Sequence, residues 1–150
     1  MLYLILKFVH VLSMAVWLGG LIMMLIVNRL LTRAGETAAM QGIGRQGARL
    51  SSLVFIPAML VTLVTGIGMV QAGDLSFGSA WIIWGMIGLV LSVILGAVLT
   101  GGAARKLGAR IARGEIDAAG IAAAQRRIMM FALLNLLLLV SIVGAMVFKP

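Results

Sequence analysis

The stretch Ile128–Phe148 reads IMMFALLNLLLLVSIVGAMVF and contains no charged residue. About 20 mostly apolar residues are needed to cross the hydrocarbon core of a bilayer, and this stretch is long enough. Three further stretches qualify, so the predicted spans are Leu4–Leu31, Leu50–Val70, Ala80–Leu99 and Ile128–Phe148. We therefore expect an all-α integral membrane protein, a four-helix antiparallel bundle that forms a single domain over residues 1–150.

The composition agrees with a membrane protein, because 63% of the 150 residues are apolar and only 11% are charged. An ordinary soluble domain is about half apolar and a quarter charged. The first span exceeds the roughly 7–15 apolar residues of a signal-peptide core and lacks a convincing cleavage site, so we interpret it as a retained helix. The absence of cysteine excludes disulfides and thiolate metal sites, and the single histidine, His10, excludes a multi-histidine metal centre within one chain.

Basic residues are concentrated on one side of the predicted bundle. Ten of the twelve lie in or beside the first and third connections, and the second connection, residues 71–79, has none. The ten are Arg29, Arg33, Arg45, Arg49, Arg105, Lys106, Arg110, Arg113, Arg126 and Arg127. The positive-inside rule places them in the cytoplasm and both termini outside, in a multi-pass protein of a bacterial inner membrane. The net charge of +8 thus indicates orientation and contact with anionic lipid, and not nucleic-acid binding.

The two basic connections are expected to be partly helical. Gly35–Arg49 and Arg105–Arg127 are rich in Ala, Gln and Arg, and Asp117 is a suitable N-cap for a helix that continues into the last span. On the opposite side, residues 71–79 are a short turn with Gly, Ser and Asp. We expect the second and third spans to form an antiparallel hairpin across it.

Small and conformationally special residues indicate where helices meet. In the third span, Gly88, Ser92 and Gly96 recur every four residues on one face, which favours close approach of another helix, either within the bundle or between protomers. Pro57 removes one backbone donor from the second span and is expected to kink it. Asn135 in the last span needs a hydrogen-bonding partner in hydrocarbon, and we interpret it as structural.

The first span holds the main concentration of polar residues at membrane depth. Lys7, His10, Met14 and Trp17 are spaced by three or four positions, so we expect all four on one broad face, with Arg29 at the inner end of the helix. Ionisable groups in a span cost roughly 2.5–3.5 kcal/mol at mid-membrane, and they therefore usually have a use or a partner. This face is the predicted functional site.

Three interpretations of His10 are open. In the first, its imidazole is an axial ligand of haem b. In the second, it binds copper together with Met14, one helical turn away, because thioether and imidazole donors suit Cu(I). In the third, no cofactor is bound and His10 is hydrogen-bonded to a neighbouring helix. The spans contain no carboxylate, so neither carboxylate catalysis nor a carboxylate cation site is expected.

Several short motifs, in order along the chain, resemble those of a group of bacterial membrane proteins. They are KFVH at 7–10, WLGG at 17–20, Arg29-Leu30, IPAML at 56–60, TG at 65–66, and Asn135 followed by VFKP at 147–150. The group comprises the HemJ-type protoporphyrinogen oxidases, the membrane domain of copper-resistance protein D (CopD-like) and related small proteins of unknown function. The resemblance implies a four-helix bundle that is often oligomeric, in which His10 matches the histidine taken as a haem ligand in the oxidases.

The chain departs from the oxidase pattern, because it lacks the further histidines of the oxidases and differs at two other places. The oxidases carry a lysine early in the third helix, where this chain has Trp84-Gly85, and their last-helix Asn-Glu-x-Pro is here Asn135-Leu136-Leu137-Leu138. An oxidase activity is therefore left open. One histidine supplies a single axial ligand, so haem would need two chains, a second ligand such as Met or Lys, or five-coordinate iron.

The first predicted function is binding of haem b or copper through His10 and its neighbours on that face, in electron transfer or in haem or copper handling. The alternative is a non-catalytic membrane subunit or scaffold, a homo-oligomer or part of a complex, that associates through the small-residue face of the third span. A solute transporter has less support, because the spans contain no acids and no evident pair of broken helices.

Overall fold

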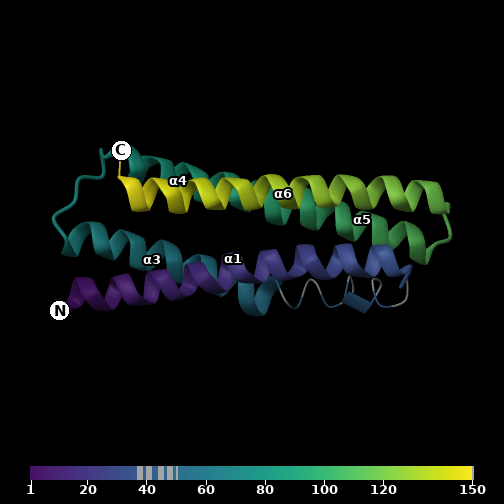
Figure 1. The fold of residues 1–150 in the computed structure, drawn as a ribbon, viewed down its shortest axis with the longest axis horizontal. Helices are drawn as coiled ribbons and strands as arrows, with labels where there is room; N and C mark the ends of the chain where they lie inside the picture. The colour runs from purple at the N-terminus through teal and green to yellow at the C-terminus, as the bar shows by residue number, and fades with distance from the viewer. Residues whose placement is uncertain (37–38, 40–41, 44–45, 47–48, 50, 150) are drawn as a thin grey trace.

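The chain folds into long helices that lie side by side (Figure 1). The computed structural model describes residues 1–36, 39, 42–43, 46, 49 and 51–149. The elements are α1 (Leu2–Ala34), a π-helical turn η1 (Ser51–Phe55), α3 (Ile56–Ala72), α4 (Ala80–Val93), a π-helical segment η2 (Ile94–Thr100), α5 (Gly101–Ala112) and α6 (Ala118–Phe148). The described residues include no strand, which confirms the all-α prediction.

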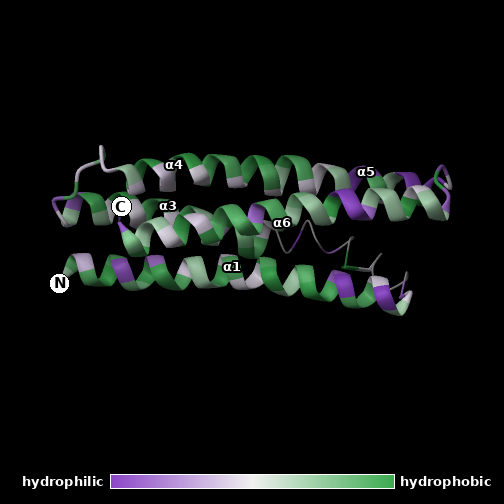
Figure 2. Cartoon of the chain, turned by 45° about the horizontal axis from the view of Figure 1, so that its top comes forward, coloured by the Kyte–Doolittle hydropathy of each residue, from purple (hydrophilic) through white to green (hydrophobic). Residues whose placement is uncertain are grey.

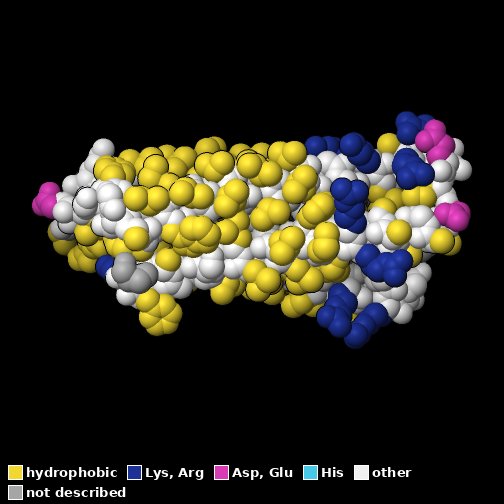
Figure 3. All heavy atoms as spheres, turned by 90° about the horizontal axis from the view of Figure 1, so that it is seen from above, with side chains coloured by type: hydrophobic (Ala, Val, Ile, Leu, Met, Phe, Trp, Pro, Cys, Tyr) yellow, Lys and Arg dark blue, Asp and Glu magenta, His cyan; other side chains and the backbone are white. Residues whose placement is uncertain are grey.

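Four helical units are long and apolar enough to cross a membrane, and each overlaps one predicted span. They are Leu2–Ala34, Ser52–Ala72, Ala80–Ala112 and Ala118–Phe148. Only 11–22% of the most apolar window of each unit is buried inside the protein, so most apolar side chains face outward. Figure 2 shows that hydrophobic residues occupy most of the helices' length, and Figure 3 shows hydrophobic side chains as a broad band along the bundle. A band of this extent needs a bilayer around it, because soluble monomers rarely expose such a surface.

The helices alternate in direction, so that both termini lie at the same end of the bundle (Figure 1). Most Lys and Arg side chains gather toward the opposite end (Figure 3). At that end α5 and the first residues of α6 extend past the predicted spans, as expected. The predicted cap is also confirmed, because Asp117 Oδ1 accepts a hydrogen bond from the Gly120 amide at 2.9 Å. The helical character expected of Gly35–Arg49, with Arg45 in it, falls largely outside the described residues.

The bundle consists of two helix pairs. α1 packs against α3, α4 and η2 pack against α6, and α1 also contacts α6 and thereby joins the pairs. α3 and α4 run antiparallel across their short turn, but these two fully described helices make no close backbone contact. The two helices are therefore consecutive and antiparallel, as predicted for a hairpin, but they do not pack against each other. The buried apolar cluster at the centre comprises Met14, Trp17, Ala58, Leu139 and Ile142.

The small-residue face of the third span is used inside the bundle, against α6. A Cβ at Gly88 would clash with Cδ1 of Ile142 and lie 2.7 Å from its Cγ1. A Cβ at Gly96 would lie 3.3 Å from Nδ2 of Asn135. Between these glycines, Ser92 Oγ donates to Asn135 Oδ1 at 2.6 Å, and both side chains are buried. Two uses of this face were predicted, and the structure contains the contact within the bundle. Asn135 has the hydrogen-bonding partner expected of it, which is Ser92.

Pro57 lies in the first turn of α3, directly after the π-helical turn Ser51–Phe55. Because proline has no backbone N–H, it cannot donate to a carbonyl of the preceding helical turn. The hydrogen bonding changes from π-helical to α-helical at Phe55 and Ile56, directly before the proline at which the kink is predicted. The helical unit Ser52–Ala72 continues through this point.

Candidate functional site

His10 lies in the N-terminal third of α1, at the contact with α3, and its side chain is only 8% exposed. Its Nδ1 is 3.0 Å from the backbone oxygen of Thr62 and 3.1 Å from Thr65 Oγ1. A carbonyl oxygen can only accept a hydrogen bond, so the tautomer assigned from this contact carries its proton on Nδ1. The neutral imidazole then presents a lone pair at Nε2.

Nε2 of His10 has no hydrogen-bond partner among the described residues. Those residues also contain no fully buried side-chain nitrogen or oxygen that lacks a partner, so Nε2 keeps some accessible surface. Histidines that bind metals commonly donate their other ring N–H to a carbonyl or carboxylate, which fixes the tautomer and the ring orientation. His10 has this arrangement.

Three buried hydroxyl groups form a hydrogen-bond network beside His10, and that of Thr65 contacts the ring itself. Ser13 Oγ donates to the backbone oxygen of His10 at 2.9 Å and lies 2.8 Å from Thr62 Oγ1. Thr65 Oγ1 donates to the Val61 carbonyl at 2.6 Å, which leaves its lone pairs free to accept from Nδ1 of His10. This network ties α1 to α3, so the ring is held by both helices of the pair.

Gly66 allows α3 to approach the ring. A Cβ at this position would lie 3.3 Å from Cε1 and 3.6 Å from Nδ1 of His10. The first of these distances is shorter than most carbon contacts in proteins, so an added Cβ would require the imidazole to shift by a few tenths of an ångström. Thr65 and Gly66 thus have complementary roles, because the first binds the ring and the second makes room for it.

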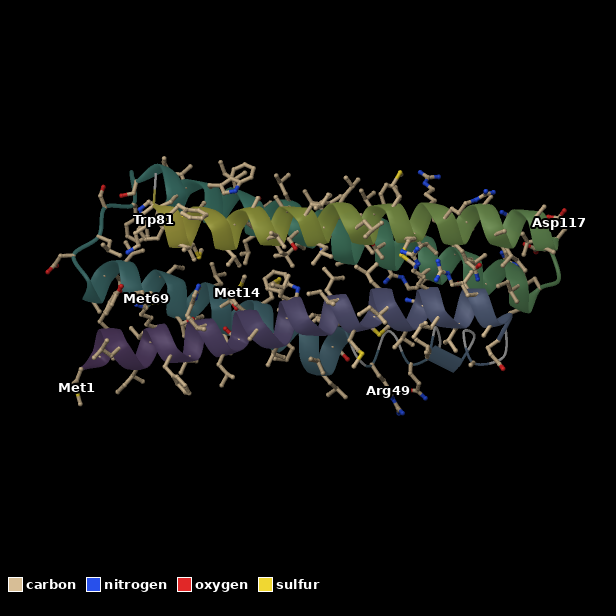
Figure 4. All side chains as sticks on the ribbon, viewed as in Figure 1. Met1, Met14, Arg49, Met69, Trp81 and Asp117 are labelled. Carbon is tan, nitrogen blue, oxygen red and sulfur yellow. The ribbon has the colours of Figure 1, made fainter. Side chains whose placement is uncertain are left out.

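The four residues of the predicted face of α1 differ in exposure, and Figure 4 marks Met14, which lies against residues of α6. Met14 and Trp17 are buried on the same side as His10, with exposed fractions of 9% and 7%. Lys7, which has the same helical spacing, is exposed near the N-terminal end of α1. Its flexible stem lets the ammonium extend to the headgroup region, which avoids burial of a charge beside His10. Arg29, near the basic end of α1, is likewise exposed.

A cavity of about 20 Å³ lies at the centre of the bundle, where side chains from α1, α3, α4 and α6 meet. Its lining includes Met14, Trp17, Thr62, Leu89 and Met146. This volume is about that of one water-sized probe, whereas pockets that enclose drug-sized ligands have roughly 300–1,000 Å³. By volume, the cavity has room for a single small ion or water and is too small for a porphyrin. The thioethers of Met14 and Met146 border this cavity. Thr62 also lines it and accepts a hydrogen bond from the neighbouring His10 ring through its backbone oxygen.

The described residues contain no cluster of three or more His, Cys, Asp or Glu side chains. Any metal bound by these residues must therefore take part of its ligands from thioethers, backbone or hydroxyl groups. Thr62 and Thr65 were not predicted, although they are the only hydroxyl-bearing residues between Leu53 and Val70 and lie three positions apart. Met146 had no distinguishing signal among eleven methionines.

Comparison with known families extends over nearly the whole chain. A family model described as predicted integral membrane protein (DUF2269) matches residues 4–150. The chain belongs to this family. The DUF2269 match includes all four membrane-spanning units and the residues around His10. Searches of curated proteins and of solved structures give no match.

Proposed function

We propose that this DUF2269 protein binds Cu(I) through His10 and Met14 and takes part in copper handling or electron transfer at a bacterial inner membrane. The observation that carries the proposal is the state of His10, whose Nδ1 is bonded to the Thr62 carbonyl while Nε2 has no partner among the described residues. By the positive-inside rule, this part of α1 lies in the outward half of the bundle.

The available donors suit Cu(I) better than other first-row ions. His10 and Met14 are four positions apart in a helix, a spacing at which Cβ atoms are about 5–6 Å apart and two side chains can reach one ion. Met146 borders the same small cavity as Met14 and offers a second thioether. Thioether and imidazole donors are soft and neutral, and they favour a monovalent soft cation over Zn²⁺ or Mg²⁺. The resemblance of the first helix to that of CopD-like proteins agrees with copper.

The second candidate ligand is haem b, which is supported by the open Nε2 of His10 and by the resemblance to HemJ-type oxidases. The central cavity of about 20 Å³ is too small for a porphyrin, so haem would lie on the lipid-facing surface. Two copies of the chain could then each supply one His10. A scaffold role has less support, because Gly88 and Ser92 are already packed against α6 of the same chain.

The test is Cu(I) affinity, measured by competition with a chromophoric Cu(I) chelator on the full chain in mild detergent. We expect His10→Ala and Met14→Leu each to weaken binding by about tenfold or more. Met23→Leu is the matched control, because Met23 is a thioether on the same helix that is 61% exposed. Unchanged affinity in both test variants would rule out copper at this site.

An optical spectrum of the same preparation separates the other outcomes. A Soret band in the parent protein that disappears in His10→Ala would assign haem in place of copper. If neither copper nor haem binds, the non-catalytic subunit becomes the better description, and His10→Ala should then leave fold and partner retention unchanged.

A further inference from the structure

A larger cavity lies at the basic end of the bundle, between α5 and the beginning of α6. Its volume is about 430 Å³, which is in the range of pockets that hold small-molecule ligands. Three of its lining residues are basic, namely Lys106, Arg110 and Arg127. The other lining residues are uncharged and include Leu107 and Ile116. The cavity thus combines an apolar floor with a concentration of positive charge.

The cavity lies at the depth of lipid headgroups. The apolar run of α6 begins at Ile128, so Arg127 marks the boundary of the hydrocarbon core. Gly120 also lines the cavity and, at 1.5 Å per residue, lies about 10 Å farther out along α6. The headgroup regions together add roughly 10–15 Å to a core of about 30 Å. The cavity therefore begins at the core boundary and extends through the headgroup layer of the leaflet on this side.

The positive charge in this cavity is not neutralised by the chain itself. Among the described residues, none of the three bases forms an ion pair. The carboxylate of Glu115 is paired instead with Arg113, at 2.7 Å. Arg110 Nη2 donates to the backbone oxygen of Glu115 at 3.4 Å, and the guanidinium of Arg127 lies 5.5 Å from the centroid of the Phe131 ring. Neither contact removes charge, so the cavity is electrostatically complementary to an anion.

We propose that this cavity is a specific binding site for an anionic phospholipid of the leaflet on the basic side of the bundle. Its phosphate is held by Lys106 and Arg127, and its glycerol and first acyl carbons lie against Leu107 and the alanines of α5 and α6. Clusters of Lys and Arg beside a membrane span attract anionic lipids, and Arg can bind phosphate oxygens in a bidentate manner. The apolar floor and the adjoining hydrocarbon favour a lipid over a soluble phosphate. The proposal is independent of the ligand of His10.

The chain itself provides matched controls. Arg105 and Arg126 are each one residue away from a cavity base and exposed, and they do not line the cavity. Neutralising them changes the net charge by the same amount as neutralising Lys106 or Arg127. A specific site and a diffuse electrostatic attraction therefore predict different results for the two sets of variants.

The experiment is native mass spectrometry of the full chain in mild detergent, titrated with phosphatidylglycerol and, separately, with phosphatidylcholine. We expect tighter binding of phosphatidylglycerol. Lys106→Gln and Arg127→Gln should each weaken that binding about fivefold, whereas Arg105→Gln and Arg126→Gln should change it less than about twofold. Equal losses in all four variants, or equal affinity for the two lipids, would overturn the proposal.

Two further arms test the apolar part of the site. Ala123→Phe places a large side chain into the cavity while every charge is kept, and it should lower phosphatidylglycerol binding to the level of phosphatidylcholine. If this variant does not fold, the paired charge variants still decide the question. Glycerol 3-phosphate supplies the headgroup phosphate without acyl chains. Binding of this compound as tightly as the lipid would assign the cavity to a soluble phosphate ligand and contradict the proposal.

Discussion

Substitution of Gly88 by alanine should destabilise the bundle, because α4 and α6 meet there without space for a methyl group. The added Cβ would clash with Cδ1 of Ile142 and lie 2.7 Å from Cγ1. Ile142 is 4% exposed and belongs to the buried cluster, so its side chain cannot swing outward freely. Overpacking a closely packed core costs about 1–3 kcal/mol.

Gly144→Ala is the matched control for this substitution, because nothing lies within 4 Å of a Cβ at Gly144. Both substitutions gain the same helix propensity, up to about 1 kcal/mol, so the difference between the two variants isolates the overpacking. Unfolding free energies can be measured in mixed micelles by SDS titration, followed by the fluorescence of Trp81 and Trp84. We expect Gly88→Ala to be less stable than Gly144→Ala by about 1–3 kcal/mol.

A double variant tests whether Ile142 is the cause. Ile142→Ala removes both Cγ1 and Cδ1, so the pair Gly88→Ala and Ile142→Ala should show a favourable coupling of at least about 1 kcal/mol in a mutant cycle. If Gly88→Ala is as stable as Gly144→Ala and the coupling is zero, the proposed packing of α4 against α6 is wrong.

Three other substitutions test the site and the basic end of the bundle. Gly66→Ala should displace the His10 ring and weaken Cu(I) binding about tenfold in the chelator competition, with helical content unchanged in circular dichroism. Thr65→Val keeps the side-chain shape but removes the hydroxyl near Nδ1, so it should also weaken Cu(I) binding about tenfold, with a shifted imidazole resonance in NMR. Asp117→Ala removes the N-cap of α6 and should cost about 0.5–2 kcal/mol locally, seen as faster amide exchange at Gly120; unchanged exchange there would contradict the capping role.

The membrane architecture could be predicted from the sequence because it depends on properties of single segments. Apolar length located four spans, and the side chain at Asp117 was sufficient to place the start of α6. Pairing of the helices could not be predicted in the same way. Lipid and protein are similarly apolar, so the choice of partner depends on close packing and hydrogen bonds between faces. Gly88 and Ser92 identified such a face, but the sequence did not show that α6 covers it.

The candidate site could likewise be predicted only where it depends on neighbours within one helix, and not where it depends on packing between helices. The spacing of His10, Met14 and Trp17 along one helix was sufficient to place them on one buried face. Lys7 fits the same spacing, yet its charge and its position near the helix end keep it exposed. The hydroxyl of Thr65 and the carbonyl of Thr62 became partners of His10 only through the packing of α3 on α1.

X-ray absorption at the copper K-edge observes the ligands of a bound ion themselves, and the full chain loaded with Cu(I) in mild detergent is the sample. With His10 and Met14 as ligands, the spectrum should contain one imidazole nitrogen together with thioether sulfur. His10→Ala should remove the imidazole scattering, and Met14→Leu should reduce the sulfur contribution. A spectrum that is identical in the parent protein and His10→Ala would contradict the assignment of His10 as a metal ligand.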